Sequence, residues 1–122
     1  MKTILIVDDD PLVCELLITL FSNEYKFIVA NNGKEGVEKF KENISNINLV
    51  ITDFNMPIMN GFEMVKAIRF LSRGVKIIFH SAGVQQLEML FDGLNFPINH
   101  FLSKPASCKE IQDTVNRLLL AT

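Results

Sequence analysis

Several features that mark specialised protein classes are missing or scarce in this sequence. Two cysteines, Cys14 and Cys108, are too few for a disulfide framework and are typical of free thiols in a reducing compartment. The formal net charge of −2 argues against a basic surface for nucleic acid. The first apolar run is only about five residues long, too short for a signal peptide, and no run approaches the roughly 20 apolar residues of a membrane span. We therefore expect one soluble, cytoplasmic domain over residues 1–122 that neither binds nucleic acid directly nor inserts into a membrane.

What the sequence does contain is a regular alternation of short apolar runs and longer helical patterns. The apolar runs predict strands over residues 3–7, 26–30, 49–53, 76–80 and 100–103. Helices are predicted over residues 11–23, from the turn near residue 33 to about residue 42, and over 62–71, 84–91 and 107–120. This alternation favours an α/β fold in which helices cover both faces of a parallel five-stranded sheet.

The first predicted helix is apolar on more than one face. Pro11 suits its first turn, and Asp9 or Asp10 suits its N-cap. The spacing of its apolar residues predicts a buried stripe that consists of Val13, Leu16, Leu17 and Leu20. Leu12, Cys14 or Ile18 is then expected to lie partly outside the core.

Polar side chains stand at the carboxyl ends of four predicted strands. Right-handed crossovers bring these strand ends to one edge of a parallel sheet, where open α/β sheets bind ligands. The residues are Asp8 and Asp9 after the first strand, Asp53 at the end of the third, Ser81 after the fourth and Lys104 after the fifth.

These residue types favour phosphoryl-transfer chemistry. Three carboxylates in one cleft need a positive counter-charge, and Mg²⁺ typically binds one or two carboxylates together with phosphate oxygens. Lys104 adds an ammonium and Ser81 a hydroxyl, both suited to phosphate oxygens. A carboxylate can also be the nucleophile, and Asp53 is the best candidate because it stands alone at a strand end facing the acidic pair.

Three motifs give the whole chain a resemblance to the receiver domains of response regulators in bacterial two-component signalling. They are "ILIVDDDP" from Ile4, "LVITDFNMPIMNGFE" from Leu49 and "HFLSKP" from His100, each at the expected strand end. The middle motif is highly specific, whereas "DDDP" alone is not. The resemblance implies a flavodoxin-like (βα)5 three-layer sandwich with strand order 2-1-3-4-5. It also implies a signalling switch that catalyses only its own phosphorylation and dephosphorylation and is not otherwise an enzyme.

The resemblance also assigns the acceptor and the metal ligands. Asp53 is implied to be the phosphoacceptor. Asp9 is implied to ligate Mg²⁺ directly, Asp8 mainly through water, and Asn55 through its backbone carbonyl.

The remaining implied roles concern the switch and its partners. Ser81 and Lys104 are implied to bind phosphate oxygens, and the rotamer of Phe101 to follow phosphorylation; a cis bond before Pro105 is frequent in relatives. The implied donors are a sensor histidine kinase, a histidine phosphotransfer protein or acetyl phosphate. A downstream protein is implied to dock on the fourth helix, fifth strand and fifth helix, and the chain to be a monomer or a phosphorylation-dependent dimer.

The chain departs from the family pattern in three places. Phe101 has no hydroxyl to offer a partner, so any contact of its ring with a partner must be apolar. His80 occupies a position that is more often apolar, and we expect it to be a hydrogen-bonded strand histidine. The segment 92–99 contains Pro97, which forbids a continuing helix and predicts a short fourth helix, so the usual output geometry is in question.

Other functions remain open at this point. Asp8 and Asp10 mimic the Asp-x-Asp motif of haloacid-dehalogenase-type phosphatases, although the chain is short and has neither a cap insertion nor the late acidic pair of that family. A receiver that binds partners without being phosphorylated is a second alternative. A flavodoxin-like flavin carrier fits worst, because the aspartates after the first strand would repel a phosphate.

Overall fold

The computed structural model describes residues 1–94 and 96–120, and strands and helices alternate throughout these ranges. The strands are β1 (Thr3–Val7), β2 (Lys26–Ala30), β3 (Ile47–Thr52), β4 (Lys76–Ser81) and β5 (His100–Ser103). The helices are α1 (Pro11–Leu20), α2 (Gly33–Glu42), α3 (Gly61–Leu71), α4 (Val84–Phe91) and α5 (Cys108–Leu120).

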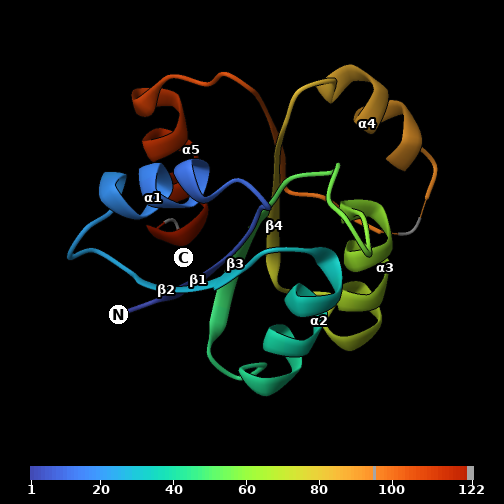
Figure 1. The fold of residues 1–122 in the computed structure, drawn as a ribbon, viewed down its shortest axis with the longest axis horizontal. Helices are drawn as coiled ribbons and strands as arrows, with labels where there is room; N and C mark the ends of the chain where they lie inside the picture. The colour runs from blue at the N-terminus through green and yellow to red at the C-terminus, as the bar shows by residue number, and fades with distance from the viewer. Residues whose placement is uncertain (95, 121–122) are drawn as a thin grey trace.

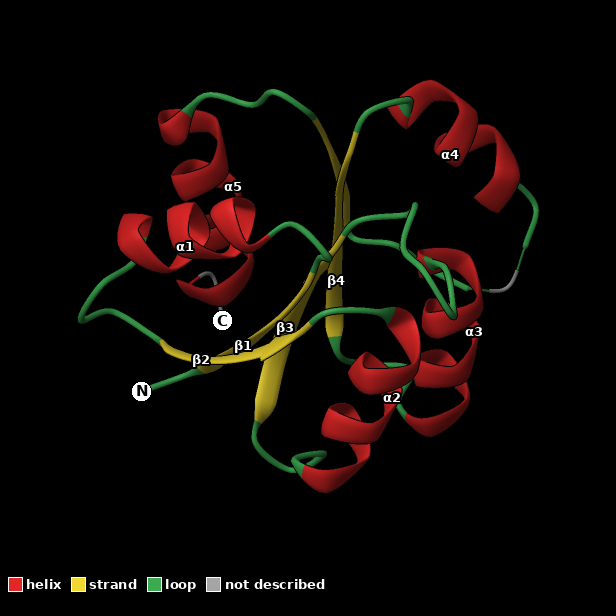
Figure 2. Cartoon of the chain, in the orientation of Figure 1, coloured by secondary structure: helices red, strands yellow, loops and turns green. Residues whose placement is uncertain are grey.

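The sheet is parallel, with strand order β2-β1-β3-β4-β5, which confirms the predicted topology. Figures 1 and 2 show α1 and α5 on one face of the sheet and α2, α3 and α4 on the other. Two separate apolar clusters fill the space between the layers, one around Ile6, Leu17 and Val115, the other around Val7, Met64 and Phe79. The sheet is therefore buried on both faces, which explains the continuous apolar run of β1.

Polar side chains cap the amino ends of several helices. Asp10 accepts a hydrogen bond from the backbone N–H of Leu12 at 2.9 Å, and Pro11 occupies the first turn of α1. Asn32 and Asn60 cap α2 and α3 in the same way. These caps fix where each helix begins after its strand, and so they fix the loops that carry the polar rim.

The structure differs from the sequence-based expectations at several boundaries. Helix α1 ends at Leu20, three residues before the expected end, and its buried residues are Cys14 and Leu17. The prediction that Leu16 belongs to the core is wrong, since this side chain is 44% exposed. The stripe that faces the sheet continues instead to Phe21, which is buried just beyond the helix, and the Cys14 thiol turns inward to donate to the Asp8 carbonyl.

Two further boundaries are shifted, and one expectation about the membrane can be checked. Strand β3 begins at Ile47, two residues earlier than expected, and Ser81 is the last residue of β4 rather than part of the following loop. Within residues 1–94 and 96–120, none of the helices has the length and apolar character needed to cross a membrane.

Candidate functional site

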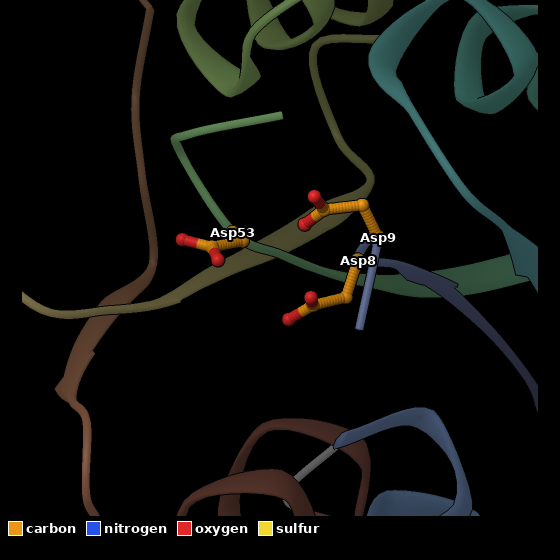
Figure 3. Close-up of side chains that lie close together, drawn as sticks. All are labelled: Asp8, Asp9 and Asp53. Atoms are coloured by element: carbon orange, nitrogen blue, oxygen red, sulfur yellow. The ribbon is translucent and has the colours of Figure 1, made fainter. Parts of the chain in front are cut away.

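Three carboxylates meet at the carboxyl edge of the sheet. Asp8 and Asp9 follow β1, and Asp53 follows β3, which pairs directly with β1. One oxygen from each carboxylate lies within 4.8 Å of the other two, and Figure 3 shows the three side chains gathered in one place. Asp8 is buried, Asp53 is partly buried and Asp9 is exposed, so the group is open to solvent on one side.

Lys104 contributes the counter-charge from the end of β5. Its ammonium donates to Asp8 Oδ2 at 3.0 Å and to Asp53 Oδ2 at 2.9 Å. The bond between Lys104 and Pro105 is cis, as the sequence resemblance implied. The predicted convergence of Asp8, Asp53 and Lys104 on one rim is confirmed by these contacts.

The two carboxylates that share Lys104 differ in acidity. Burial raises the pKa of Asp8 above its usual value, and the hydrogen bonds from the Asp10 backbone and from Lys104 only partly offset it. Burial also acts to raise the pKa of Asp53, but hydrogen bonds from Lys104 and Ser81 outweigh it and hold that pKa below its usual value. Asp53 is therefore the carboxylate whose ionised form the site favours.

Burial acts to lower the pKa of Lys104, but its two carboxylate partners overcome this and raise the pKa above its usual value. The lysine is thus held in its charged form. A charged ammonium between two carboxylates is a group that can follow a new negative charge when one arrives at Asp53.

The other predicted site residues are Ser81, at the end of β4, and Asn55, in the loop after β3. Ser81 is buried at the end of β4 and lowers the pKa of Asp53 through its side chain. Asn55 is exposed in the loop between β3 and α3. Both residues line one open cavity of about 370 Å³ beside the carboxylates, together with residues of α4.

Phe101, the predicted switch residue, belongs to an aromatic group under α4. Its ring stacks on Phe79 with centroids 5.9 Å apart and planes at 8°, and it lies 6.2 Å from the ring of Phe91. Phe62 adds a further contact with Phe91. Phe101 is partly buried, so its ring packs on the core and also reaches the surface between α4 and β5.

Gly61 is a positioning residue that the sequence analysis does not assign. A Cβ atom at this residue would lie 2.3 Å from the Asp53 carbonyl oxygen and 2.8 Å from the Phe79 ring. Only glycine lets the first turn of α3 approach Asp53 so closely. The signal was present in the sequence as Asn60-Gly61, because Asn60 is the N-cap of α3 and the glycine follows it directly.

The donor set at this edge fits a hard divalent cation. The ligand atoms are carboxylate oxygens, which Mg²⁺ prefers, and they lie close enough together to share one ion. The group contains neither a thiol nor an imidazole, the ligands that softer metals select. Asp8, Asp9 and Asp53 therefore fit magnesium.

The fold and this rim define a flavodoxin-like α/β protein that carries an acidic site at the carboxyl edge of its sheet. The chain belongs to the response regulator receiver domain family, whose model matches residues 4–116. It is therefore a receiver domain of the two-component type, from a family of signalling switches.

Known relatives support this assignment. The chain is similar to the response regulator SaeR of Staphylococcus aureus strain USA300, with 28% identity over 120 residues, or 98% of this chain. The match covers 51% of SaeR, so the chain spans about half the length of the curated relatives it matches.

Two solved structures share both fold and sequence similarity. One is the response regulator protein TrrA from Thermotoga maritima in complex with Mg²⁺ and BeF, with 33% identity and a TM-score of 0.82 over 98% of this chain and 100% of that one. The other is the CheX–CheY–BeF3–Mg²⁺ complex from Borrelia burgdorferi, with 29% identity and a TM-score of 0.85 over 96% of this chain and 88% of that one.

Proposed function

We propose that this chain is a phosphorylation-controlled switch that accepts a phosphoryl group on Asp53. The observation that carries the proposal is the position of Lys104, whose ammonium contacts Asp53 and Asp8 together. A nucleophilic carboxylate, an adjacent acidic pair and a lysine are the parts that transfer of a phosphoryl group to a carboxylate requires.

Each residue has a distinct part in the proposed reaction. An ionised Asp53 oxygen forms a bond to phosphorus while the bond between phosphorus and the donor breaks, and the electron pair of that bond leaves with the donor. Lys104 and Ser81 contact the oxygens of the transferred group. Asp8, Asp9, Asp53 and the Asn55 carbonyl would hold Mg²⁺, which would supply positive charge to the phosphoryl oxygens.

The proposed donor is a sensor histidine kinase or a histidine phosphotransfer protein, with acetyl phosphate as a small substitute. Relatives of similar sequence are known in complex with Mg²⁺ and beryllium fluoride, a tetrahedral group like a phosphoryl group on a carboxylate. We place the reaction in the cytoplasm, where these donors carry their phosphoryl groups.

The proposed output is a change of the surface formed by α4, β5 and α5. Phosphorylation adds a charge of about −1.5 to −2 at Asp53, which draws Ser81 and Lys104 toward it. Movement of Ser81 at the end of β4, and of the loop that follows it, changes the space beside Phe101, whose ring already lies at the edge of this surface. A downstream protein then binds one of two states, and the chain acts as a monomer or as a phosphorylation-dependent dimer.

The first experiment measures the intact mass of the protein after incubation with acetyl phosphate, with and without Mg²⁺. We expect a metal-dependent gain of one phosphoryl group in the natural chain and none in Asp53→Asn. The amide of this variant is not a nucleophile, and its fold should be intact because Asp53 lies on the rim and not in the apolar core.

The alternatives give different results in the same experiment. A label that persists in Asp53→Asn, disappears in Asp8→Asn and accompanies continuous donor consumption would identify a haloacid-dehalogenase-type phosphatase. Absence of label with acetyl phosphate and also with a phosphorylated histidine phosphotransfer protein would leave a receiver that binds partners without phosphorylation.

A further inference from the structure

The open cavity beside the proposed acceptor has the polar side chains of Asn55, Ser81 and Gln86 in its lining, and Gln86 is the one that α4 supplies. The cavity is about 370 Å³, and its walls come from the loop after β3, the end of β4 and the first two turns of α4. Leu87 and Leu90 give it an apolar wall, whereas Asn55 and Ser81 stand on the side of the acceptor. Gln86, from α4, is the remaining polar side chain of the lining.

The side chain of Gln86 lies directly over Gly83. A Cβ atom built on Gly83 would stand 3.2 Å from Oε1 and 3.9 Å from Cδ of Gln86. Gly83 has a φ of +63°, a left-handed conformation that glycine adopts without strain. Gly83 follows Ser81 by two residues and has no side chain. The Gln86 carboxamide lies beside the space that a side chain at residue 83 would occupy.

A carboxamide in this place has the hydrogen-bonding capacity that hydrolysis of an aspartyl phosphate needs. It accepts one hydrogen bond through its oxygen and donates two through its nitrogen, so it can hold a water molecule and contact a phosphoryl oxygen together. A glutamine that orients the attacking water is an established device in phosphoryl transfer to water. The cavity is open to solvent, so water has access to it.

We infer that Gln86 is a positioning residue for the water that hydrolyses the phosphorylated form of Asp53, and that it thereby sets how long the switch stays on. The inference rests on the proposed phosphorylation of Asp53. In the step itself, the water oxygen forms a bond to phosphorus while the bond from phosphorus to Asp53 breaks, and the electron pair returns to the carboxylate. Both water hydrogens remain on the released dihydrogen phosphate.

The test compares Gln86 with its neighbour Gln85, which is the same residue type on the same helix, is also exposed, and does not line the cavity. Natural protein, Gln86→Met, Gln86→Glu and Gln85→Met are loaded with acetyl phosphate and Mg²⁺ and freed of donor. Loss of the phosphoryl group is then followed by intact mass. Methionine keeps the length of the side chain and removes its polar atoms, whereas glutamate keeps an oxygen that accepts from water.

We expect Gln86→Met to lengthen the phosphoryl lifetime about tenfold, as loss of orientation of a reacting water predicts. Gln85→Met should decay at the natural rate, and Gln86→Glu should decay faster than Gln86→Met. A natural rate in Gln86→Met, or equal slowing in both Met variants, would overturn the inference. Failure of the natural chain to gain a phosphoryl group from any donor would instead refute the proposed function, so the two failures are distinguishable.

Discussion

At the scale of single residues, two aspartates of the rim differ in acidity although they share a lysine. Asp8 and Asp53 contact the same ammonium, yet the pKa of Asp8 is raised and that of Asp53 is lowered. Burial acts to raise the pKa of both carboxyls, so the difference comes from their neighbours: Asp53 receives a further hydrogen bond from Ser81, whereas the charge of Asp53 raises the pKa of Asp8. A carboxylate that stays ionised is a competent nucleophile, so the site favours Asp53 for that role.

His80 predicts a dependence of stability on pH. Burial, reinforced by the positive charge of Lys104, lowers the pKa of His80 to about 4, whereas Asp53 acts in the opposite direction. The unfolded chain protonates this histidine near its usual pKa of 6.5, so stability is full above that value and falls as the pH drops toward 4. Between pH 7 and pH 5 we expect His80 to remove about 2 kcal/mol from the free energy of unfolding.

Urea unfolding at both pH values, in the natural chain and in His80→Leu, measures this contribution. Between pH 7 and pH 5, the free energy of unfolding of the natural chain should fall by about 2 kcal/mol more than that of His80→Leu. His100→Gln, a change at the other histidine, should behave like the natural chain. Equal losses in the natural chain and His80→Leu would show that His80 is not buried in its neutral form.

Sequence patterns identified most of the rim, because residue type and strand-end position are both visible in the chain. Asp8, Asp53 and Lys104 could be placed together from topology alone, and the structure joins them through measured contacts. The prediction that His80 is fully hydrogen-bonded is wrong: within the described residues its Nδ1 atom is buried without a partner. That result depends on which neighbours enclose the ring, and sequence spacing does not contain this information.

At the scale of elements, Arg69 joins the end of α3 to the loop before β5. The side chain is 5% exposed, and it donates to the carbonyl oxygens of Pro97, Val75, Arg73 and Ser72. Two of its bonds go to Pro97, at 2.9 Å from Nε and 2.6 Å from Nη2. None of the described acidic residues forms an ion pair with Arg69, so backbone carbonyl dipoles, with a longer contact of 3.5 Å to Asn99 Oδ1, compensate its charge.

Removal of this guanidinium should destabilise the fold and loosen the segment before β5. We expect Arg69→Met to lower the free energy of unfolding by about 3 kcal/mol, because several buried carbonyls lose their donors. Arg69→Lys should retain only part of the stability that Arg69→Met loses, since an ammonium lacks the planar, forked set of donors of a guanidinium. Chemical denaturation measures both effects.

The control for this prediction is Arg73→Met, which removes an exposed cation in the bend that follows α3 and should change stability by less than about 0.5 kcal/mol. Similar losses in Arg69→Met and Arg73→Met would contradict a specific role for the Arg69 contacts.

Elements were easier to predict than their packing. The strands and helices were found in order because apolar periodicity is local, and the short α4 followed from Pro97. The buried face of α1 was misjudged because apolar residues surround that helix, and only the direction in which it crosses the sheet selects Cys14 and Leu17 over Leu16. The role of Arg69 could not be predicted either, since most of its partners are backbone carbonyls, which any residue type provides.

At the scale of the whole molecule, the acidic rim predicts that magnesium stabilises the fold. The rim gathers three carboxylates, of which Lys104 contacts only Asp8 and Asp53, so it carries excess negative charge that a bound Mg²⁺ ion would relieve. An ion that binds only the folded state adds about 1.4 kcal/mol at ten times its dissociation constant, which for a domain of this size raises the melting temperature by about 5 °C.

Thermal unfolding with increasing MgCl2, at constant ionic strength, measures this gain. Asp9→Asn should reduce it strongly, because it removes a carboxylate of the group. Asp10→Asn is the matched control, since this residue lies outside the group and asparagine caps a helix as well as aspartate does. A gain that survives Asp9→Asn unchanged would place the ion elsewhere.

The contacts of Lys104 also bear on when the protein becomes competent during its synthesis and folding. The lysine meets Asp8 across 96 positions of the chain and Asp53 across 51. A nascent chain that has not yet released β5 contains Asp53 but not Lys104 beside it, and contacts of such long range are slow to form in folding. The proposed phosphoryl transfer therefore requires the completed fold, and a chain in which β5 is not yet in place should not perform it.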